Sequence, residues 1–493
     1  MNPRILAVVL LLALNLALDS SASMGQGTGA APVRALTGKL TPCRLPDVED
    51  EVLCGRYEVY ENRAAGTGRK LGLNIVVLPA KAPDAAADPL VFLAGGGVAP
   101  ATRYARFLGR AFPELRRRRD ILLIDQRGSG ASNPLECDLS TDPANAEYRD
   151  EARFLGAVRR CRKELERKAD LRYYTTPVAM DDLDEVRNWL GYPRLNLYGA
   201  SYGTTAAIVY LRQHPERVRS VVLQGVLPLD EPMWLEYPRS SQQALDNAFA
   251  ACARQQGCHD AFPNVAEEFS TLLKRLAEKP VKVKVSTSPT SQEVEVPIDA
   301  EILRGFVVRV LYSAERIHDL PLLVHLAHAG DYQPLARRLA SRDEGWIPKG
   351  VYLSIVCSEE IPKFDAAAVP AAAAGTFMGE LRLGRDVLAC GEWVRGWLPR
   401  DYRAPVRSSV PVLLLTGALD HATPPPYGER VARSLANARH LVMPGRGHND
   451  TDPCVSEIIQ AFVTAGRLEG LDASCLSKTE ELSFALRADE LVN

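Results

Sequence analysis

The sequence predicts an α/β protein in which a mostly parallel sheet, with helices on both faces, is interrupted by a large and mainly helical insertion. The first observation is a set of short apolar runs that end in glycine-containing loops, among them Pro89–Leu93 and Asp120–Ile124. Such runs are typical of buried parallel strands. The second is the stretch 229–403, whose periodicity is largely helical, with strand signals before and after it. A chain of 493 residues is long enough for a large core with an insertion.

The predicted elements follow in order along the chain. Cys54–Glu61 and Lys70–Pro79 alternate in hydrophobicity and predict a hairpin. After the two buried strands we expect a helix, a strand, a second helix and a further strand: 182–190, 195–198, 204–210 and 219–223. The insertion has a polar interruption near 286–295. Strand signals resume at 411–416 and 439–443.

The predicted organisation divides the chain into six parts. In order, these are a signal peptide (1–23), a flexible leader (24–40), the first part of the core (41–228), a cap insertion (229–403), the second part of the core (404–475) and a charged, loosely held C-terminal tail (476–493).

The first residues resemble a secretory signal. Arg4 supplies the positive end, and Ile5–Ala17 is apolar but short for a membrane span. Ser21–Ser23 offers small residues for cleavage. An uncleaved anchor is the alternative. We expect a protein exported to the periplasm or the medium, with no membrane attachment after the signal is removed.

The ten cysteines agree with export, because disulfides persist in oxidising compartments. The sequence does not prove their connectivity. They fall in neighbouring pairs, which we expect to be bridged: Cys43 with Cys54, Cys137 with Cys161, Cys252 with Cys258, Cys357 with Cys390, and Cys454 with Cys475. A metal site is not expected, because no Cys-x-x-Cys occurs and no histidine has ligand spacing from a cysteine.

The overall charge does not favour nucleic acid or an anionic membrane as a partner. The formal net charge is −2, and the charged fraction of 24% is ordinary for a globular protein. The only basic cluster, Arg116–Arg119, has no aromatic residues among its charges, and we expect it to be a solvated helix end.

A Gly-x-Ser-x-Gly pattern at Gly199–Gly203 lies between the predicted strand at 195–198 and the helix at 204–210. The chain must reverse there within a few residues, and the two glycines have no Cβ to clash across the turn. Ser201 is then exposed at the tip, with the amide of Tyr202 at the start of the helix. This strand-turn-helix resembles the nucleophile elbow of α/β-hydrolases.

A serine needs a base, and in that fold an acid and then a histidine follow it along the chain. Asp420 comes after the predicted strand 411–416 at a turn that contains glycine. His448 lies in a glycine-containing loop directly after the last strand. Because the order and the positions both fit, Ser201, Asp420 and His448 are the predicted catalytic triad. His421 is interpreted as a spacer in the turn.

The second amide of an oxyanion hole is expected from a loop after an early strand. Gly95–Gly97 is the best candidate, because glycine lets its backbone amide approach a substrate oxygen closely. We choose Gly96, together with Tyr202, for the oxyanion hole; the neighbours of Gly96 remain alternatives.

The segment Asp125–Ser132, with the sequence Asp-Gln-Arg-Gly-Ser-Gly-Ala-Ser, resembles the signature of proline iminopeptidases and their secreted tripeptidyl-aminopeptidase relatives. The elbow, the segments around Asp420 and His448, and the paired cysteines are also similar to the secreted branch. The resemblance covers roughly residues 41–475 and implies a serine aminopeptidase. One departure concerns the oxyanion loop, where the family usually has Gly-Gly-Pro-Gly: Gly97 stands in place of the proline and Val98 in place of the last glycine.

The resemblance also implies acidic cap residues that bind the free amino terminus of a substrate. Glu359 and Glu360 are the candidates, because they lie beside Cys357, which we expect to be bridged. A solvated loop with two ordinary glutamates is the alternative.

We therefore expect an exported, monomeric serine aminopeptidase without a cofactor, which releases single residues such as proline, or tripeptides, through an acyl-enzyme. The alternative is an esterase that uses the same triad on small esters. A binding protein on an inactive scaffold is disfavoured because all three triad residues are present. Haloalkane dehalogenase and epoxide hydrolase chemistry is disfavoured because it requires a carboxylate at the elbow.

Overall fold

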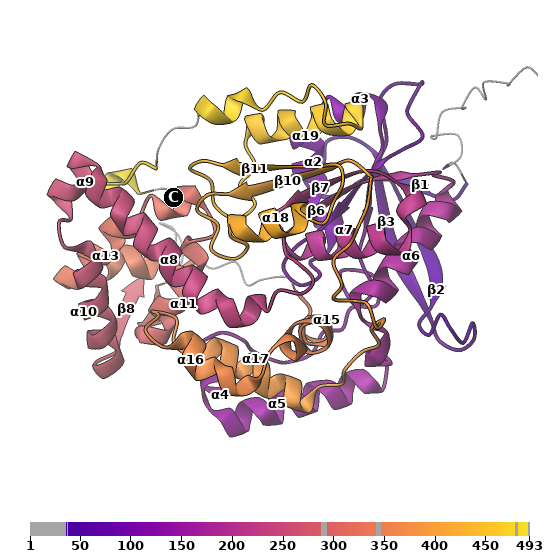
Figure 1. Cartoon of the computed structure of the whole chain (residues 1–493). Helices are drawn as coiled ribbons and strands as arrows, with labels where there is room; N and C mark the ends of the chain where they lie inside the picture. Colours follow the sequence, from indigo (N-terminus) through magenta and orange to yellow (C-terminus); the bar gives the residue numbers. More distant parts are fainter. Residues whose placement is uncertain (1–35, 37, 287–292, 342–346, 479–481, 492–493) are drawn as a thin grey trace, which may run out of the picture.

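The computed structural model describes residues 36, 38–286, 293–341, 347–478 and 482–491 (Figure 1). The predicted signal peptide and most of the predicted leader lie outside these residues. Within the described part of the chain, no helix combines the length and the apolar character needed to cross a membrane.

In the part of the chain that the structure describes, nine strands form one sheet in the order β1-β2-β3-β5-β4-β6-β7-β10-β11. The first three strands and β5 pair antiparallel, and all pairs from β5 to β11 are parallel. The mostly parallel sheet predicted from the sequence is therefore confirmed. The strands are β1 (Thr41–Cys43), β2 (Val52–Tyr60), β3 (Lys70–Leu78), β4 (Leu90–Leu93), β5 (Ile121–Ile124), β6 (Leu195–Ala200), β7 (Val218–Gln224), β10 (Val412–Gly417) and β11 (Ala438–Met443).

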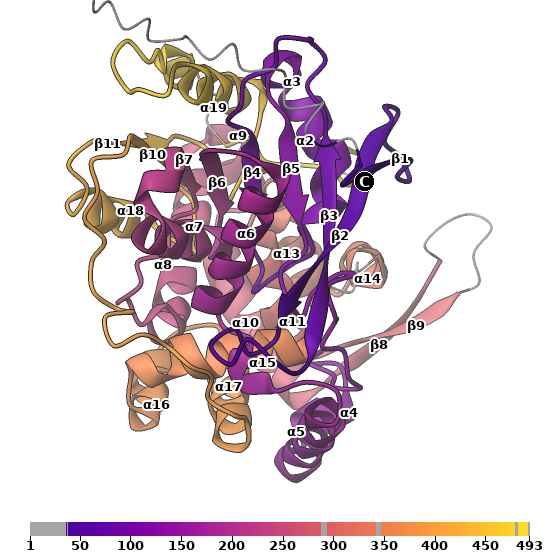
Figure 2. The same cartoon turned by 90° about the vertical axis from the view of Figure 1, so that its right-hand side faces the viewer.

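Helices cover both faces of this sheet (Figures 1 and 2). The central strands β4 and β5 are apolar at every position, and successive side chains of β3 join different cores: Ile75 packs with α6 and α7, whereas Val76 packs with α2, α3 and α19. The helices of these layers are α2 (Ala105–Ala111), α3 (Leu115–Arg118), α6 (Thr176–Leu190), α7 (Tyr202–Gln213), α18 (Pro425–Ala432) and α19 (Pro453–Ala465).

Between β7 and β10 the chain leaves the sheet and is mainly helical (Figure 1). Its helices are α8 (Met233–Arg254), α9 (Gln256–Ala261), α10 (Val265–Glu278), α11 (Ala300–Val310), α12 (Ala314–Ile317), α13 (Leu320–Ala329), α14 (Gln333–Ala340), α15 (Lys349–Ile355), α16 (Val369–Ala373) and α17 (Leu381–Glu392). Many of these helices share a second apolar core, separate from the sheet. Two helices from the first half of the chain, α4 (Ala146–Arg149) and α5 (Glu151–Glu166), lie beside α17, because Arg385 donates to the carbonyls of Tyr148 and Arg149.

Two details differ from the sequence predictions. Around the polar interruption near 286–295 the insertion is not helical: β8 (Val281–Val285) and β9 (Val294–Ile298) pair antiparallel there and extend from the helices in Figure 2. Residues 287–292 of the interruption lie outside the described residues. The basic cluster is not fully solvated: Arg116 and Arg119 are buried and pair with Asp50 and Asp88 at 2.6 and 3.0 Å. Both arginine side chains are buried and each guanidinium pairs with a carboxylate, so the charges of Arg116 and Arg119 are not left to solvent alone.

All ten cysteines form disulfides, and the partners are the neighbouring pairs predicted from the sequence. The bridges join Cys43 to Cys54, Cys137 to Cys161, Cys252 to Cys258, Cys357 to Cys390, and Cys454 to Cys475.

Four of the bridges connect loops and helix ends to neighbouring helices. Cys161 on α5 holds the loop that follows β5, and Cys258 on α9 fixes the turn at the end of α8. Cys357 and Cys390 join the segment after α15 to α17, and the bridge that starts at Cys454 holds the chain after α19.

The C-terminal segment 482–491 packs on the helical insertion, so the tail is not loosely held over this part. Phe484 and Ala485 are 7% and 0% exposed and belong to the second apolar core. The amide of Ala485 donates to the carbonyl of His318 at 3.0 Å. The sequence prediction went wrong because a short apolar group inside a charged stretch gives no periodic signal.

Removing the aromatic anchor of this segment should destabilise the insertion. Phe484→Ala should lower the free energy of unfolding by about 3 kcal/mol, because a large buried side chain is lost. Leu486→Ala is the matched control and should change stability by at most about 0.5 kcal/mol, since Leu486 is 38% exposed. Urea denaturation followed by circular dichroism measures both; equal effects would show that the segment does not depend on Phe484.

Candidate active site

The turn between β6 and α7 presents Ser201 at its tip. Ser201 has φ 55° and ψ −123°, a backbone conformation that residues with a Cβ rarely adopt. Close packing forces this turn: a Cβ placed on Gly199 would lie 2.3 Å from the carbonyl oxygen of Gly203, and one on Gly203 would lie 1.9 Å from that of Leu93. Ser201 remains partly accessible at the point where the strand becomes a helix.

The predicted acid and base are in hydrogen-bond contact. His448 Nδ1 lies 2.9 Å from Asp420 Oδ2, and both side chains are buried. Asp420 also accepts hydrogen bonds from the amides of Ala422 and Thr423 and from the Thr423 hydroxyl. Burial tends to raise the pKa of Asp420, but His448 and the Thr423 hydrogen bonds outweigh it and hold the pKa below its usual value. The carboxylate is therefore ionised and fixes the imidazole ring.

Ser201 and His448 converge on the end of β7. The Ser201 amide donates to the carbonyl of Gln224 at 2.8 Å. A Cβ placed on the next residue, Gly225, would lie 2.9 Å from His448 Cε1. Ser201 is far in sequence from Asp420 and His448, yet all three lie around the carboxyl ends of adjacent strands.

The loop after β4 lies against the elbow. A Cβ placed on Gly95 would lie 2.8 Å from the Cβ of Ser201. The amides of Gly96 and Gly97 donate no hydrogen bond to any described residue. Tyr202 is the first residue of α7, so its amide also lacks an intrahelical acceptor. These amides are suited to an oxygen that acquires negative charge near Ser201.

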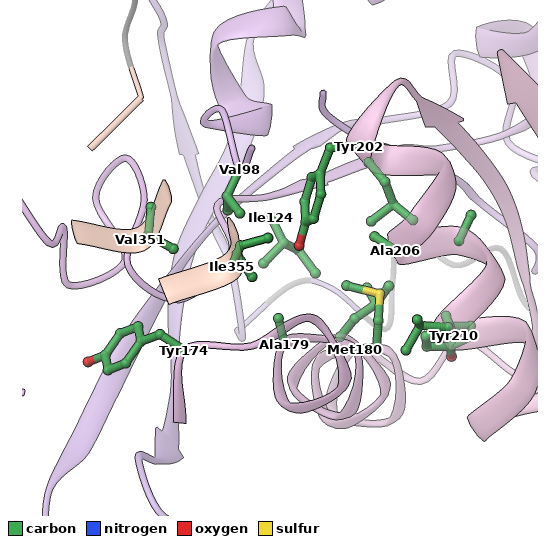
Figure 3. Close-up of a cluster of buried hydrophobic side chains, with 14 of the residues drawn as sticks. Val98, Ile124, Tyr174, Ala179, Met180, Tyr202, Ala206, Tyr210, Val351 and Ile355 are labelled. Carbon is green, nitrogen blue, oxygen red and sulfur yellow. The ribbon is translucent and has the colours of Figure 1, made fainter. Parts of the chain in front are cut away.

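The departure from Gly-Gly-Pro-Gly has a backbone explanation. Gly96, Gly97 and Val98 have φ values of 68°, 71° and 79°. Proline at position 97 would require φ near −65°, so glycine is needed for this path. Val98 is strained in that region, and its 1% exposure shows that packing holds it there. Figure 3 shows Val98 and Tyr202 within the buried cluster that also includes Ile124 and Ile355.

Glu359 and Glu360 lie in a π-helical turn, Val356–Glu360, and are 0% and 6% exposed. Glu359 accepts hydrogen bonds from the amide and hydroxyl of Thr176 and from the Tyr402 hydroxyl. Both oxygens of Glu360 accept from Lys363 at 3.0 Å. Burial raises the pKa of Glu359 to about 7. The two glutamates are therefore not solvated loop residues, and their oxygens already have donors.

A cavity of about 240 Å³ lies between α5, α11, α15 and α17 and contains charges that the sequence analysis did not single out. Arg382 and Asp386, one helical turn apart on α17, line it. Ile347 and Tyr352 line it too, and their side chains would lie 3.0 and 3.1 Å from a Cβ placed on Gly96 and Gly97, respectively. The cavity thus adjoins the loop that approaches Ser201. An Arg-Asp pair at helical spacing resembles a solvated helix face, and no local signal marks it as part of a site.

Aromatic side chains connect the cavity to the base. The Arg382 guanidinium lies 5.3 Å from the centre of the Tyr237 ring. The Tyr237 hydroxyl lies 2.9 Å from that of Tyr312 and 3.0 Å from His421 Nε2. The ring of Tyr312 meets that of His448 edge to face at 5.2 Å. His421 is buried, and burial lowers its pKa to about 3, so it is neutral and supports the tyrosines rather than serving only as a spacer.

The Asp125–Ser132 signature follows β5 and is held by buried side-chain contacts to neighbouring elements. Asp125 accepts hydrogen bonds from Thr102 and Asn74 and from the amide of Ala131, which fixes the loop. Arg127 forms a buried, two-pronged ion pair with Asp182 on α6. Across the described residues, no group of three metal-ligating side chains converges on a point.

The fold and this arrangement define a serine hydrolase of the α/β-hydrolase class. Family models match the chain as an alpha/beta hydrolase fold over residues 88–293 and as a TAP-like protein over residues 376–475. The resemblance inferred from the sequence is thereby confirmed at the level of the family. The chain is similar to the serine protease Hip1 of Mycobacterium tuberculosis, with 25% identity over 92% of this chain and 93% of the relative.

Two further relatives carry aminopeptidase names. The tripeptidyl aminopeptidase of Streptomyces lividans is 25% identical over 72% of this chain and 70% of its own length. The proline iminopeptidase of Arabidopsis thaliana is 31% identical over 29% of this chain and 27% of its own.

The nucleophile assignment predicts a specific labelling result. A fluorophosphonate probe should label Ser201 in the native protein, and Ser201→Ala should lose both the label and several orders of magnitude of kcat. Labelled peptides identified by mass spectrometry measure this directly. Labelling of Ser201→Ala at the native rate would assign the nucleophile elsewhere.

The oxyanion loop offers a second test. Gly97→Pro restores the residue that is usual in the family, but it should lower kcat at least about tenfold, because proline cannot adopt φ 71° and the loop must move away from Ser201. Fluorophosphonate labelling of the variant would show whether Ser201 remains reactive. Unchanged kcat would mean that the loop amides do not stabilise the transition state.

Proposed function

We propose that this chain is an exported aminopeptidase that releases short N-terminal units, either single residues such as proline or tripeptides, from peptides through an acyl-enzyme. The observation that carries the proposal is an acidic side chain in a cavity beside the oxyanion loop: Asp386 lines the cavity that Ile347 and Tyr352 share with Gly96 and Gly97. A carboxylate in a partly desolvated cavity suits a protonated amino terminus.

The geometry supports the following chemistry. Ser201 attacks the carbonyl carbon of the substrate while His448 takes the hydroxyl proton, and Asp420 stabilises the imidazolium. The amides of Gly96 and Tyr202 donate to the carbonyl oxygen as it becomes negative. His448 then protonates the leaving amine, and water activated by the same base releases the acyl group from Ser201.

Asp386 is a better candidate for the amine site than Glu359 or Glu360. Glu359 has three hydrogen-bond donors, and Glu360 shares an ion pair with Lys363, whose side chain is 2% exposed. An amine could bind either glutamate only after these contacts were broken. Asp386 accepts a hydrogen bond from the neutral Tyr352 hydroxyl at 3.2 Å and lines the cavity.

Export is supported by the five disulfides and by the signal-like segment at residues 1–23. The substrate class is supported by the aminopeptidase names of the relatives and by the large helical insertion, which suits small or terminal substrates. A carboxylic-ester hydrolase is the second candidate, because the triad acts on esters as well as on amides.

The proposed contact between Asp386 and the substrate's amino terminus predicts a preference for free over N-acetylated peptides, and this preference should depend on pH. Burial raises the pKa of Asp386 to about 6, so its carboxylate forms as the pH rises through that value. An α-amino group remains protonated up to a pH of about 7.7–8. The ratio of kcat/KM for a free peptide to that for its N-acetylated form should therefore rise roughly tenfold between pH 5 and 7. Because both substrates use the same triad, the ionisation of His448 cancels in this ratio.

Two variants identify the carboxylate. Asp386→Asn should shrink the preference and remove its pH dependence, mainly by raising KM for the free peptide, whereas Glu360→Gln should retain both. The reverse result would assign the amine site to Glu360. Equal rates on free and acetylated peptides, or hydrolysis of p-nitrophenyl esters alone, would favour the esterase.

A further inference from the structure

Arg382 presents a guanidinium to the cavity without a charged partner in contact. Among the residues that the structure describes, no hydrogen bond or ion pair involves its side chain, which is exposed to the cavity. Arg304 also lines the cavity, but it pairs with Glu301. Lys349, a third cation of the lining, donates to Thr141 at 2.9 Å. Arg382 therefore differs from the other cations of the cavity in having donors available for a ligand.

The two charges of α17 are held apart. Arg382 and Asp386 are separated by four positions, a spacing at which opposite charges commonly pair. Here they do not form an ion pair, because each has an aromatic neighbour: the Arg382 guanidinium lies over the Tyr237 ring, and Asp386 accepts from the Tyr352 hydroxyl. The pair is thus open on the cavity side, with a cation and an anion about 5–6 Å apart at their Cβ atoms.

The position of this pair relates it to the reacting bond. The ring of Tyr352 contacts Gly97, and its hydroxyl donates to Asp386. A single tyrosine side chain therefore spans the distance between Asp386 and the oxyanion loop. Tyr237 touches Arg382 with its ring and Tyr312 with its hydroxyl, and Tyr312 meets His448. A group bound between Arg382 and Asp386 is therefore close enough to belong to the same short substrate whose carbonyl lies at Ser201.

We propose that Arg382 is a specificity-determining residue that binds a carboxylate on the N-terminal residue of the substrate, so that peptides beginning with glutamate or aspartate are preferred. This inference rests on the proposed function, in which Asp386 takes the amino group. The α-amine and the side-chain carboxylate of one acidic residue are only a few bonds apart, so a single residue can present its amine to Asp386 and its carboxylate to Arg382. The planar guanidinium can bind that carboxylate with two hydrogen bonds, whereas glutamine offers only one neutral acceptor.

The test compares substrates that differ only in this charge. We would measure kcat/KM for X-Ala-Ala-p-nitroanilide and X-p-nitroanilide, where X is Glu, Gln or Leu, and for the matching p-nitrophenyl esters, on the full-length disulfide-bonded protein. Glu should be preferred over Gln by about 10- to 100-fold, the range for a charge-assisted contact of roughly 1.5–3 kcal/mol. Arg382→Gln should reduce this ratio to near one, and Arg382→Lys should restore part of it.

Arg304→Gln is the matched control, since Arg304 lines the same cavity but is already paired. It should leave the Glu/Gln ratio unchanged even if the absolute rates fall. Because each ratio is measured on one preparation, a partly unfolded variant does not imitate the predicted effect.

The outcomes separate this inference from the proposed function. A native Glu/Gln ratio near one, or a preference that persists in Arg382→Gln, would overturn the role of Arg382, while cleavage of free but not acetylated anilides would leave the aminopeptidase intact. Conversely, a preference for Glu esters that depends on Arg382, in an enzyme that cleaves no anilide, would support the carboxylate site and refute the peptidase.

Discussion

The site depends on one close backbone approach, between the elbow and the loop after β4. Gly203 lies so near the carbonyl of Leu93, and Gly95 so near Ser201, that no side chain fits at either position. This contact fixes the serine in an unfavourable conformation and brings the loop amides beside it. The strands β4 and β6 beside Ser201 and Val98 are buried at every position. The close packing of this sheet holds both residues in their strained conformations.

Charge is organised differently in the two halves of the site. Around Asp420 every oxygen has a donor, so the carboxylate is ionised and stationary, as a group that orients a base must be. In the cavity, Arg382 and Asp386 form no ion pair with each other and keep capacity for further contacts, and neutral tyrosines contact both of them. Fully satisfied charges hold the chemistry in place, whereas incompletely satisfied ones are the groups that can recognise a ligand.

The parts that the sequence predicted have local signals. The elbow combines a strand, two glycines and a helix, and Asp420 and His448 each follow a strand, so their positions could be inferred without knowing any long-range contact. The burial of Arg116 and the docking of Phe484 depend on partners far away in the chain. The role of Glu359 could not be seen either: next to a cysteine it resembles a solvated acid, and only the approach of Thr176 and Tyr402 reveals a buried acceptor. Arg382 and Asp386 were not predicted either, because in the sequence they too resemble solvated charges.

The bridge between Cys357 and Cys390 has a consequence for selectivity. It ties the π-helical turn that follows Tyr352 to the helix that carries Arg382 and Asp386, so the two walls of the cavity are covalently coupled. The triad contains no such bridge between its members. Oxidation of this cysteine pair therefore acts on the cavity that we propose to bind the substrate, and not directly on Ser201, Asp420 or His448. Because a disulfide forms only under oxidising conditions, the shape of this cavity depends on the redox conditions under which the chain folds.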